Sequence, residues 1–271
     1  MKNATIHQYL EPVICIAKAA GNAIMQIYST NFDIAKKEDN SPLTEADLAS
    51  HSLISLALNK LTPNIPILSE ESAEIDFQTR QQWKQYWLID PLDGTREFIK
   101  RNGEFTVNIA LINQHLPVLG VVYAPASEII YFATKSYGAY KQVKFSEVCK
   151  IVAKKSNLKN IVIAGSRSHI NKKMEDFLIN IGNRSGKSPE LINMGSSLKT
   201  CLVAEGVVDL YPRLGPTSEW DTAAAHCILL EAGGDVVDIS GSRLLYNNKK
   251  SLLNPDFFAQ GKGGINWSIY L

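Results

Sequence analysis

The sequence predicts a mixed α/β protein in which an α+β half precedes an α/β half, and three observations support this. Residues 10–28 place apolar side chains at steps of three and four, as on one face of a helix. The stretches "EFTVNIALI" and "PVLGVVYAPASEIIYFAT" are rich in β-branched and aromatic residues, which is typical of antiparallel strands. Strand-like and helix-like segments then alternate, so we expect an α+β subdomain at 1–155 and an α/β subdomain at 156–271.

The first half is predicted to open with two helices and to continue as a sheet. After the helix at 10–28, helical spacing resumes beyond Leu43, and Pro63 ends it. The apolar run in "IPILSEES" closes on acids, as does the run in "LIDPLDGTREF". The lysine-rich stretch 141–159 is expected to be a solvated linker or a sheet edge.

The second half begins with "NIVIAGSRSH", which predicts a buried strand that enters a loop, and a helix follows near residues 174–181. "GSSLKTCLVAEG", "VVDLYPR" and "TSEWDTAAAHCILLEAGG" continue the alternation of strand and helix. Trp220, in the last of these, is expected in the core.

Composition excludes several classes of protein. Hydrophobic residues at 45% and charged residues at 20% are ordinary for a folded protein, which excludes a disordered or fibrous chain. The net charge of +1 is interspersed and forms no basic stripe, so we expect no nucleic-acid partner. No apolar stretch reaches the roughly 18 residues of a membrane span. The four cysteines form no C-x-x-C pair, and we expect buried, reduced thiols in a cytoplasmic protein.

Two carboxylates, Asp90 and Asp93, follow the apolar run of "LIDPLDGTREF". Pro91 has no N–H and cannot continue a strand ladder, and Gly94 permits a sharp turn or a close backbone approach. A turn just past the strand end would gather both acids and the Leu92 carbonyl at one point. The alternative is that the acids merely cap a turn or the following helix.

Three further acids occupy similar places. Glu70 ends the apolar run of "IPILSEES". Asp221 stands at a predicted helix start behind Ser218, and Asp47 stands in a first helical turn behind Thr44. Capping explains Asp47 and Asp221 singly but does not explain Glu70. The repetition favours a shared acidic site.

An acidic cluster requires a cation, because like charges close together otherwise force protonation. Hard oxygen donors favour Mg²⁺, or Mn²⁺ and Ca²⁺, over Zn²⁺. The charge of four carboxylates balances that of two Mg²⁺ ions, and the negative charge of an arriving phosphate permits a third, more weakly bound cation. The predicted ligands are Glu70, Asp90, the Leu92 carbonyl, Asp93 and Asp221.

This ligand set suits phosphoryl transfer, whose transition state needs positioning and charge neutralisation rather than a covalent partner. Two metals about 3.5–4 Å apart activate a water and stabilise the leaving oxygen. If Gly94 and Thr95 open a helix, their N–H groups would face the phosphate. Thr95 would also pass a water proton toward Asp47.

The motifs "SEES", "DPLDGT" and "EWDTAAAH", in this order, resemble the inositol monophosphatase superfamily of Mg²⁺-dependent, Li⁺-sensitive phosphatases. The resemblance covers nearly the whole chain. The stretches "REFIKRNGEFTVNIALI", "GSRSH", "GSSLKTCLVAEG" and "YPRLGPTSEWDTAA" are similar to its CysQ-type 3'(2'),5'-bisphosphate nucleotidase branch. The resemblance implies a layered α/β/α/β/α sandwich and hydrolysis of 3'-phosphoadenosine 5'-phosphate to AMP and phosphate.

The resemblance also implies residue roles. Thr95 with Asp47, aided by Glu70, would activate the attacking water. The metal ligands would be Glu70, Asp90, Leu92 through its carbonyl, Asp93 and Asp221, holding two or three Mg²⁺ ions. The substrate phosphate would be contacted by Glu70, Leu92, Asp93, Gly94, Thr95 and Asp221.

A nucleotide substrate needs cations and hydrogen-bond donors for its second phosphate, and the second half offers candidates. Lys199 and Arg213 are the main ones, with a solvated helix residue as the alternative for Lys199. Further candidates lie at a predicted strand end and a predicted helix start, where backbone N–H groups bind anions. These are Ser166, Arg167, Ser168, His169, Gly195, Ser196 and Ser197, with N-capping as the alternative for Ser196 and a plain loop position for His169.

Three alternatives compete with this prediction. An aspartyl-phosphate phosphatase would use D-x-D on a strand, whereas Asp90 and Asp93 are three apart and Glu70 and Asp221 would be idle. An ion or phosphate sensor would not need the Thr95 hydroxyl. A third alternative keeps the chemistry but takes inositol phosphate or fructose bisphosphate. The resemblance also permits peripheral attachment to the cytoplasmic face of the inner membrane.

Overall fold

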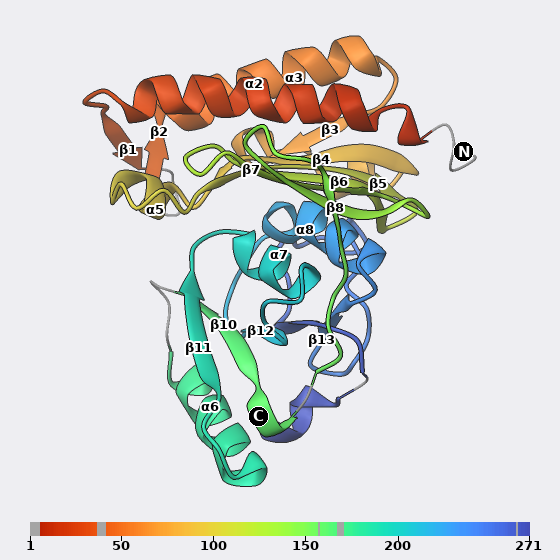
Figure 1. Cartoon of the computed structure of the whole chain (residues 1–271). Coiled ribbons are helices and arrows are strands. Elements are labelled where there is room, and N and C mark those ends of the chain that lie inside the picture. Colours follow the sequence, from red (N-terminus) through yellow and green to blue (C-terminus); the bar gives the residue numbers. More distant parts are fainter. Residues whose placement is uncertain (1–5, 37–41, 157, 167–170, 264) are drawn as a thin grey trace.

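Helices and sheets alternate in layers in the computed structural model of the chain (Figure 1). Helices α2 (Leu10–Tyr28) and α3 (Glu45–Leu61) cover one face of a seven-stranded sheet. Helices α7 (Leu198–Ala204) and α8 (Glu219–Glu231) lie between it and a five-stranded sheet, whose far face carries α6 (Lys172–Ser185). The predicted α/β/α/β/α sandwich is thereby confirmed. The structure describes residues 6–36, 42–156, 158–166, 171–263 and 265–271.

The seven-stranded sheet has the strand order β3-β4-β5-β6-β7-β8-β9. All neighbours are antiparallel except the parallel pair β3 and β4. Alternate side chains of β4 enter different cores: Trp87 and Ile89 pack toward α2 and α3, while Tyr86 and Leu88 pack toward α8. The strands are β3 (Ile67–Ser69), β4 (Gln85–Asp93), β5 (Thr106–Asn113), β6 (Leu116–Ala124), β7 (Ile129–Thr134), β8 (Gly138–Val143) and β9 (Cys149–Ile151).

The five-stranded sheet has the order β11-β10-β12-β14-β13, and its first three strands are parallel. Ser166, Met194 and Arg213 end these three strands at one sheet edge, where open α/β sheets commonly bind ligands. The strands are β10 (Val162–Ser166), β11 (Glu190–Met194), β12 (Leu210–Arg213), β13 (Asp235–Asp238) and β14 (Phe257–Gln260).

Short elements complete the fold. Strands β1 and β2 form an antiparallel pair beside α5, and the remaining pieces are single helical turns. Their bounds are β1 (Ile34–Lys36), β2 (Pro42–Thr44), η1 (Glu70–Ser72), α4 (Phe77–Arg80), α5 (Thr95–Ile99), η2 (Leu158–Asn160) and η3 (Trp267–Tyr270).

Helix α8 packs directly against the middle of the seven-stranded sheet because β6 carries a glycine there. A Cβ on Gly120 would lie 2.3 Å from the carbonyl oxygen of Ala224. The neighbours Ala223 and Ala225 are also buried, so small residues on both sides permit the close approach. This contact fixes the helix whose first turn carries Asp221.

The chain passes from one sheet to the other between Ile151 and Val162. One buried core contains residues from both sides of this crossing, for example Leu88 and Leu229. The boundary near residue 155 between two subdomains stays a prediction.

The cysteine prediction is wrong for two of the four. Cys201 and Cys227 are buried free thiols, but Cys15 and Cys149 are exposed. Cys15 lies on the outer side of α2, between positions that do face the core, and Cys149 begins the edge strand β9. Apolar neighbours in sequence do not bury a helical residue, because successive residues point about 100° apart.

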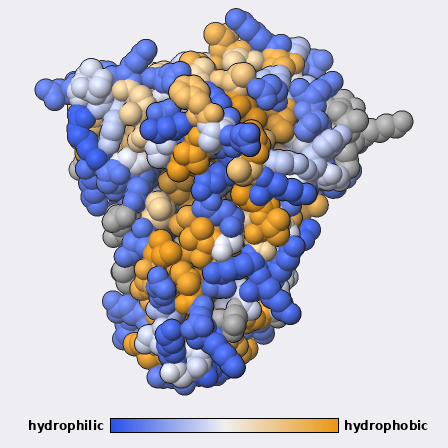
Figure 2. Space-filling model, viewed as in Figure 1, coloured by the Kyte–Doolittle hydropathy of each residue, from blue (hydrophilic) through white to orange (hydrophobic). Residues whose placement is uncertain are grey.

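Hydrophilic and hydrophobic residues are mixed on the face shown in Figure 2, which is usual for a folded domain. None of the described helices has the length and apolar character needed to cross a membrane. Trp220 is partly buried and packs against the core between the sheets, as expected.

Candidate active site

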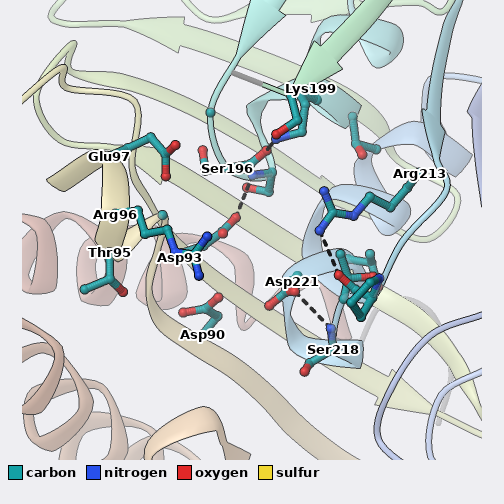
Figure 3. A pocket seen from close by; sticks show the side chains of 18 of the residues that line it. Asp90, Asp93, Thr95, Arg96, Glu97, Ser196, Lys199, Arg213, Ser218 and Asp221 are labelled. Carbon is teal, nitrogen blue, oxygen red and sulfur yellow. Dashed lines mark hydrogen bonds between the residues drawn. The ribbon is translucent and has the colours of Figure 1, made fainter. Parts of the chain in front are cut away.

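The predicted site residues come together around one cavity of about 360 Å³. Its walls come from both halves of the chain, and Figure 3 shows side chains from both pointing into it. Asp47 does not line this cavity, but it accepts a hydrogen bond from Thr95, which does. The predicted residues that line the cavity are Glu70, Asp90, Leu92, Asp93, Gly94, Thr95, Ser166, Gly195, Ser196, Ser197, Lys199, Arg213 and Asp221.

A bulge in β4 brings Asp90 and Asp93 to the same place. Asp90 pairs with Asn108 and Asp93 pairs with Thr106, so Pro91 and Leu92 together face a single residue of β5. The extra residue reverses the alternation and returns Asp93 to the face of Asp90. The prediction of a turn past the strand end is therefore wrong, since both acids lie within β4. The prediction that the two acids lie close together is correct, because the bulge brings them to one face.

Local hydrogen bonds hold this bulge. The Leu92 N–H donates to Asp90 Oδ1 at 3.0 Å, as in an Asx turn. The hydroxyl of Ser50, on α3, donates to the Pro91 carbonyl at 2.7 Å. The bulge is thus tied to the helix that also carries Asp47.

The carboxylates of Asp90, Asp93 and Asp221 point toward one another, with one oxygen of each within 4.8 Å of the others (Figure 3). Burial, followed by the charges of Glu70, Asp93 and Asp221, raises the pKa of Asp90 well above its usual range. Burial, followed by Asp93 and Glu70, raises the pKa of Asp221 to about 8. All-oxygen ligands that resist joint ionisation fit a hard divalent cation.

Capping interactions orient two of the acids. Asp221 accepts the Ser218 N–H at 2.9 Å in a capping box at the start of α8. Asp47 forms the same motif at the start of α3, where its Oδ2 accepts the Thr44 N–H at 2.8 Å. The prediction that these two acids cap helices is therefore correct for both. Asp47 nevertheless also accepts a hydrogen bond at Oδ1 from the Thr95 hydroxyl, at 3.2 Å.

Gly94 and Thr95 open a helix, as expected. Gly94 is the N-cap of α5 with φ +91°, a left-handed conformation that favours glycine. A Cβ there would lie 3.1 Å from the Glu104 carbonyl oxygen. The turn places the Thr95 hydroxyl between Asp47 and the Leu92 carbonyl, the latter at 3.3 Å.

Lys199 and Arg213 supply positive charge on the second-half side of the cavity. The alternative of a solvated Lys199 is wrong, because its exposed fraction is 6% and burial lowers its pKa to about 8. Its Nζ donates to the Ser196 carbonyl at 2.6 Å and lies 5.2 Å from the Tyr211 ring centre. Arg213 Nη2 donates to the Pro216 carbonyl at 2.7 Å.

Among the other second-half candidates, Gly195, Ser196 and Ser197 line the cavity. Ser166 lines the cavity, while Arg167, Ser168 and His169 lie outside the described residues. Ser197, rather than Ser196, is the N-cap residue of α7.

Sequence reasoning missed a buried polar group beside Asp93. Asn108 and Thr106, on β5, hydrogen-bond to each other, and Asn108 Nδ2 donates to Asp93 Oδ2 at 3.3 Å. The available signal was an asparagine inside the apolar run "TVNIALI", where a buried amide needs partners.

The fold and the acidic cavity define a class, the metal-dependent phosphatases with a layered α/β sandwich. The chain belongs to the inositol monophosphatase family, whose model matches residues 6–263. It is 48% identical to the 3'(2'),5'-bisphosphate nucleotidase CysQ of Salmonella typhimurium over 92% of this chain and 98% of that one. The corresponding CysQ of Haemophilus influenzae is 39% identical, covering 97% of each chain.

Solved structures agree with this assignment. A crystal structure of CysQ from Bacteroides thetaiotaomicron superposes with a TM-score of 0.80 at 40% identity. The match covers 92% of this chain and 95% of that one.

Proposed function

We propose that this chain is a Mg²⁺-dependent 3'(2'),5'-bisphosphate nucleotidase that hydrolyses 3'-phosphoadenosine 5'-phosphate to AMP and phosphate. The names of its CysQ relatives support the substrate class. The observation that carries the chemistry is the cavity itself, where three clustered carboxylates meet a threonine–aspartate pair and the cations Lys199 and Arg213. A site that only bound ions would not need that pair.

The proposed metal ligands are the oxygens gathered at the bulge and around it. They are Glu70, Asp90, the Leu92 carbonyl, Asp93 and Asp221, and we propose two or three Mg²⁺ ions. Bound Mg²⁺ would neutralise phosphate charge and lower the pKa of a water.

The protein's own groups would handle the proton. As the water oxygen bonds to phosphorus, its proton passes to Thr95 Oγ1, whose own proton moves to Asp47 Oδ1, 3.2 Å away. The bond from phosphorus to the ribose oxygen would break in line with this attack, and the leaving oxygen would take a proton from a second water to become the product hydroxyl. Glu70 would help to orient the water, and the N–H groups of Gly94 and Thr95 would hold the phosphate oxygens.

Lys199 and Arg213 are proposed to bind the second phosphate. Both side chains donate hydrogen bonds to main-chain carbonyls. A bound phosphate would take the place of these carbonyls and accept charge-assisted hydrogen bonds from the two cations. Leu253 and Phe257 line the same cavity and offer apolar surface to a nucleoside. An inositol phosphate would leave both features unused.

Phosphate release by the purified protein with Mg²⁺ tests this proposal, comparing 3'-phosphoadenosine 5'-phosphate, inositol 1-phosphate and fructose 1,6-bisphosphate with and without Li⁺. We expect preference for the nucleotide and inhibition by Li⁺. Preference for another substrate would keep the metal chemistry and discard the nucleotide. No release from any of them would favour the sensor, and a trapped phospho-aspartate at Asp90 would favour the covalent mechanism.

A cytoplasmic location, with peripheral attachment to the inner membrane as an addition, is also proposed from the family resemblance. Fractionation of cells, with a salt wash of the membranes, tests both parts.

A further inference from the structure

Three buried polar side chains form a hydrogen-bonded group beside Asp93. Thr106 and Asn108 lie on β5, and Ser197 is the N-cap residue of α7. The Ser197 and Thr106 hydroxyls meet Asn108 Oδ1 at 2.8 and 3.0 Å, and they lie 2.9 Å from each other. All three side chains are buried. We refer to these three residues as the Asn108 triad.

The triad and the Asp93 carboxylate together fix which end of the Asn108 amide faces Asp93. Because both hydroxyls meet Oδ1, the amide nitrogen is directed to Asp93 Oδ2, at 3.3 Å. The flipped amide would place its oxygen against a carboxylate oxygen of Asp93, two acceptors with no hydrogen between them. A buried site strongly disfavours that arrangement.

Asp93 receives a second donor from the same triad. The Ser197 backbone N–H donates to Asp93 Oδ2 at 2.6 Å. Within the described part of the chain, both hydrogen bonds to Asp93 therefore fall on Oδ2, and neither occupies Oδ1. This leaves Oδ1 for the cluster with Asp90 and Asp221.

We propose that Asn108 is a positioning residue of the metal site, which acts through Asp93, and that Thr106 and Ser197 orient it. The inference rests on the proposed role of Asp93 as a metal ligand. Hydrogen bonds behind a ligating group set its orientation, and their loss typically weakens metal binding by about 10–100-fold. Since Ser197 belongs to the second half and Asn108 to the first, the triad also ties α7 to the ligand strand.

The test is the Mg²⁺ dissociation constant of the full chain, measured by calorimetric titration without substrate. Asn108→Leu keeps the branched shape and the number of side-chain heavy atoms and removes the amide, so we expect Mg²⁺ to bind about 10–100-fold more weakly. Thr106→Val removes one orienting hydroxyl and should cause a smaller loss in the same direction. Thr134→Val is the matched control, since it removes another buried hydroxyl that does not line the cavity, and it should leave Mg²⁺ binding unchanged.

A double variant separates action through Asp93 from a general loss of structure. In an Asp93→Ala background, Asn108→Leu should change the Mg²⁺ dissociation constant less than about twofold, because the group it positions is gone. An undiminished loss there would overturn the proposal. So would a folded Asn108→Leu protein that binds Mg²⁺ as the unaltered chain does.

Two further outcomes are decisive. If Asn108→Leu does not fold, Thr106→Val decides, and unchanged Mg²⁺ binding by that variant would overturn the proposal. The measurement needs no substrate, so a chain that binds Mg²⁺ but prefers inositol phosphate would refute the proposed nucleotide substrate and leave the role of Asn108 intact.

Discussion

The acidic wall of the cavity, Asp90, Asp93 and Asp221, comes from both halves of the chain, whereas Lys199 and Arg213, which we call its cationic wall, come from the second half. A further cation, Arg96 on α5, also lines the cavity. The acids are crowded with like charge, which only a cation or a proton relieves. Lys199 and Arg213 donate hydrogen bonds to main-chain carbonyls. An anionic ligand can take the place of these carbonyls, and the two cations then remain paired.

This difference indicates a division of work. The carboxylates of the acidic wall must all be present to hold a cation, so these residues should be intolerant of substitution. The cationic wall has exchangeable partners, so its residues should adjust which phosphate ester is accepted rather than whether one is hydrolysed. The following predictions test that contrast, starting with the largest effect.

Removing one charge from the acidic wall should nearly abolish turnover. Asp93→Asn keeps the side-chain shape but removes the anion, and we expect kcat to fall by about 10³-fold, as when a main electrostatic group of an active site is lost. Steady-state phosphate release measures this, with circular dichroism to confirm folding. An unchanged rate would exclude Asp93 as a metal ligand and with it the contrast between the walls.

Thr95 should affect the rate rather than the binding of substrate. Thr95→Val removes the hydroxyl that donates to Asp47, and kcat should fall by about 10²-fold with a small change in KM. Thr95→Ser keeps the hydroxyl and serves as the matched control. If Thr95→Ser lost as much activity as Thr95→Val, the shape of the side chain rather than its hydroxyl would explain the loss.

On the cationic wall, substitution should change specificity. Arg213→Met should raise KM for 3'-phosphoadenosine 5'-phosphate by about 10-fold, the value of one charge-assisted hydrogen bond, and should leave KM for adenosine 3'-phosphate unchanged. Lys173→Met, an exposed cation outside the cavity, is the control. Equal losses on both substrates would place Arg213 at the reacting phosphate and would weaken the distinction between the walls.

The sequence predicts helices and site residues better than it predicts contacts between distant parts of the chain. Spacing predicted α2 to its bounds, because a helix face leaves a period that survives in the sequence. The acids were found because they repeat at the ends of apolar runs. Sequence reasoning missed the β4 bulge and the Asn108 triad, since a one-residue register shift and a contact between β5 and α7 depend on pairing across the chain.

The last prediction concerns pH and the metal-free protein. The folded pKa of Asp221, about 8, exceeds its unfolded value, so the folded state holds a proton that the unfolded state has lost. The contribution of Asp221 to stability is therefore present below the unfolded pKa and declines as pH rises toward 8, by up to about 1.4 kcal/mol per pH unit. Asp221→Asn has no such proton to lose, so the difference in free energy of unfolding between variant and unaltered chain should grow across this range. Saturating Mg²⁺ should remove the slope, since the cation replaces the proton. A slope that persisted with Mg²⁺ would show that Asp221 lies apart from the metal and that the acidic wall is built from first-half residues alone.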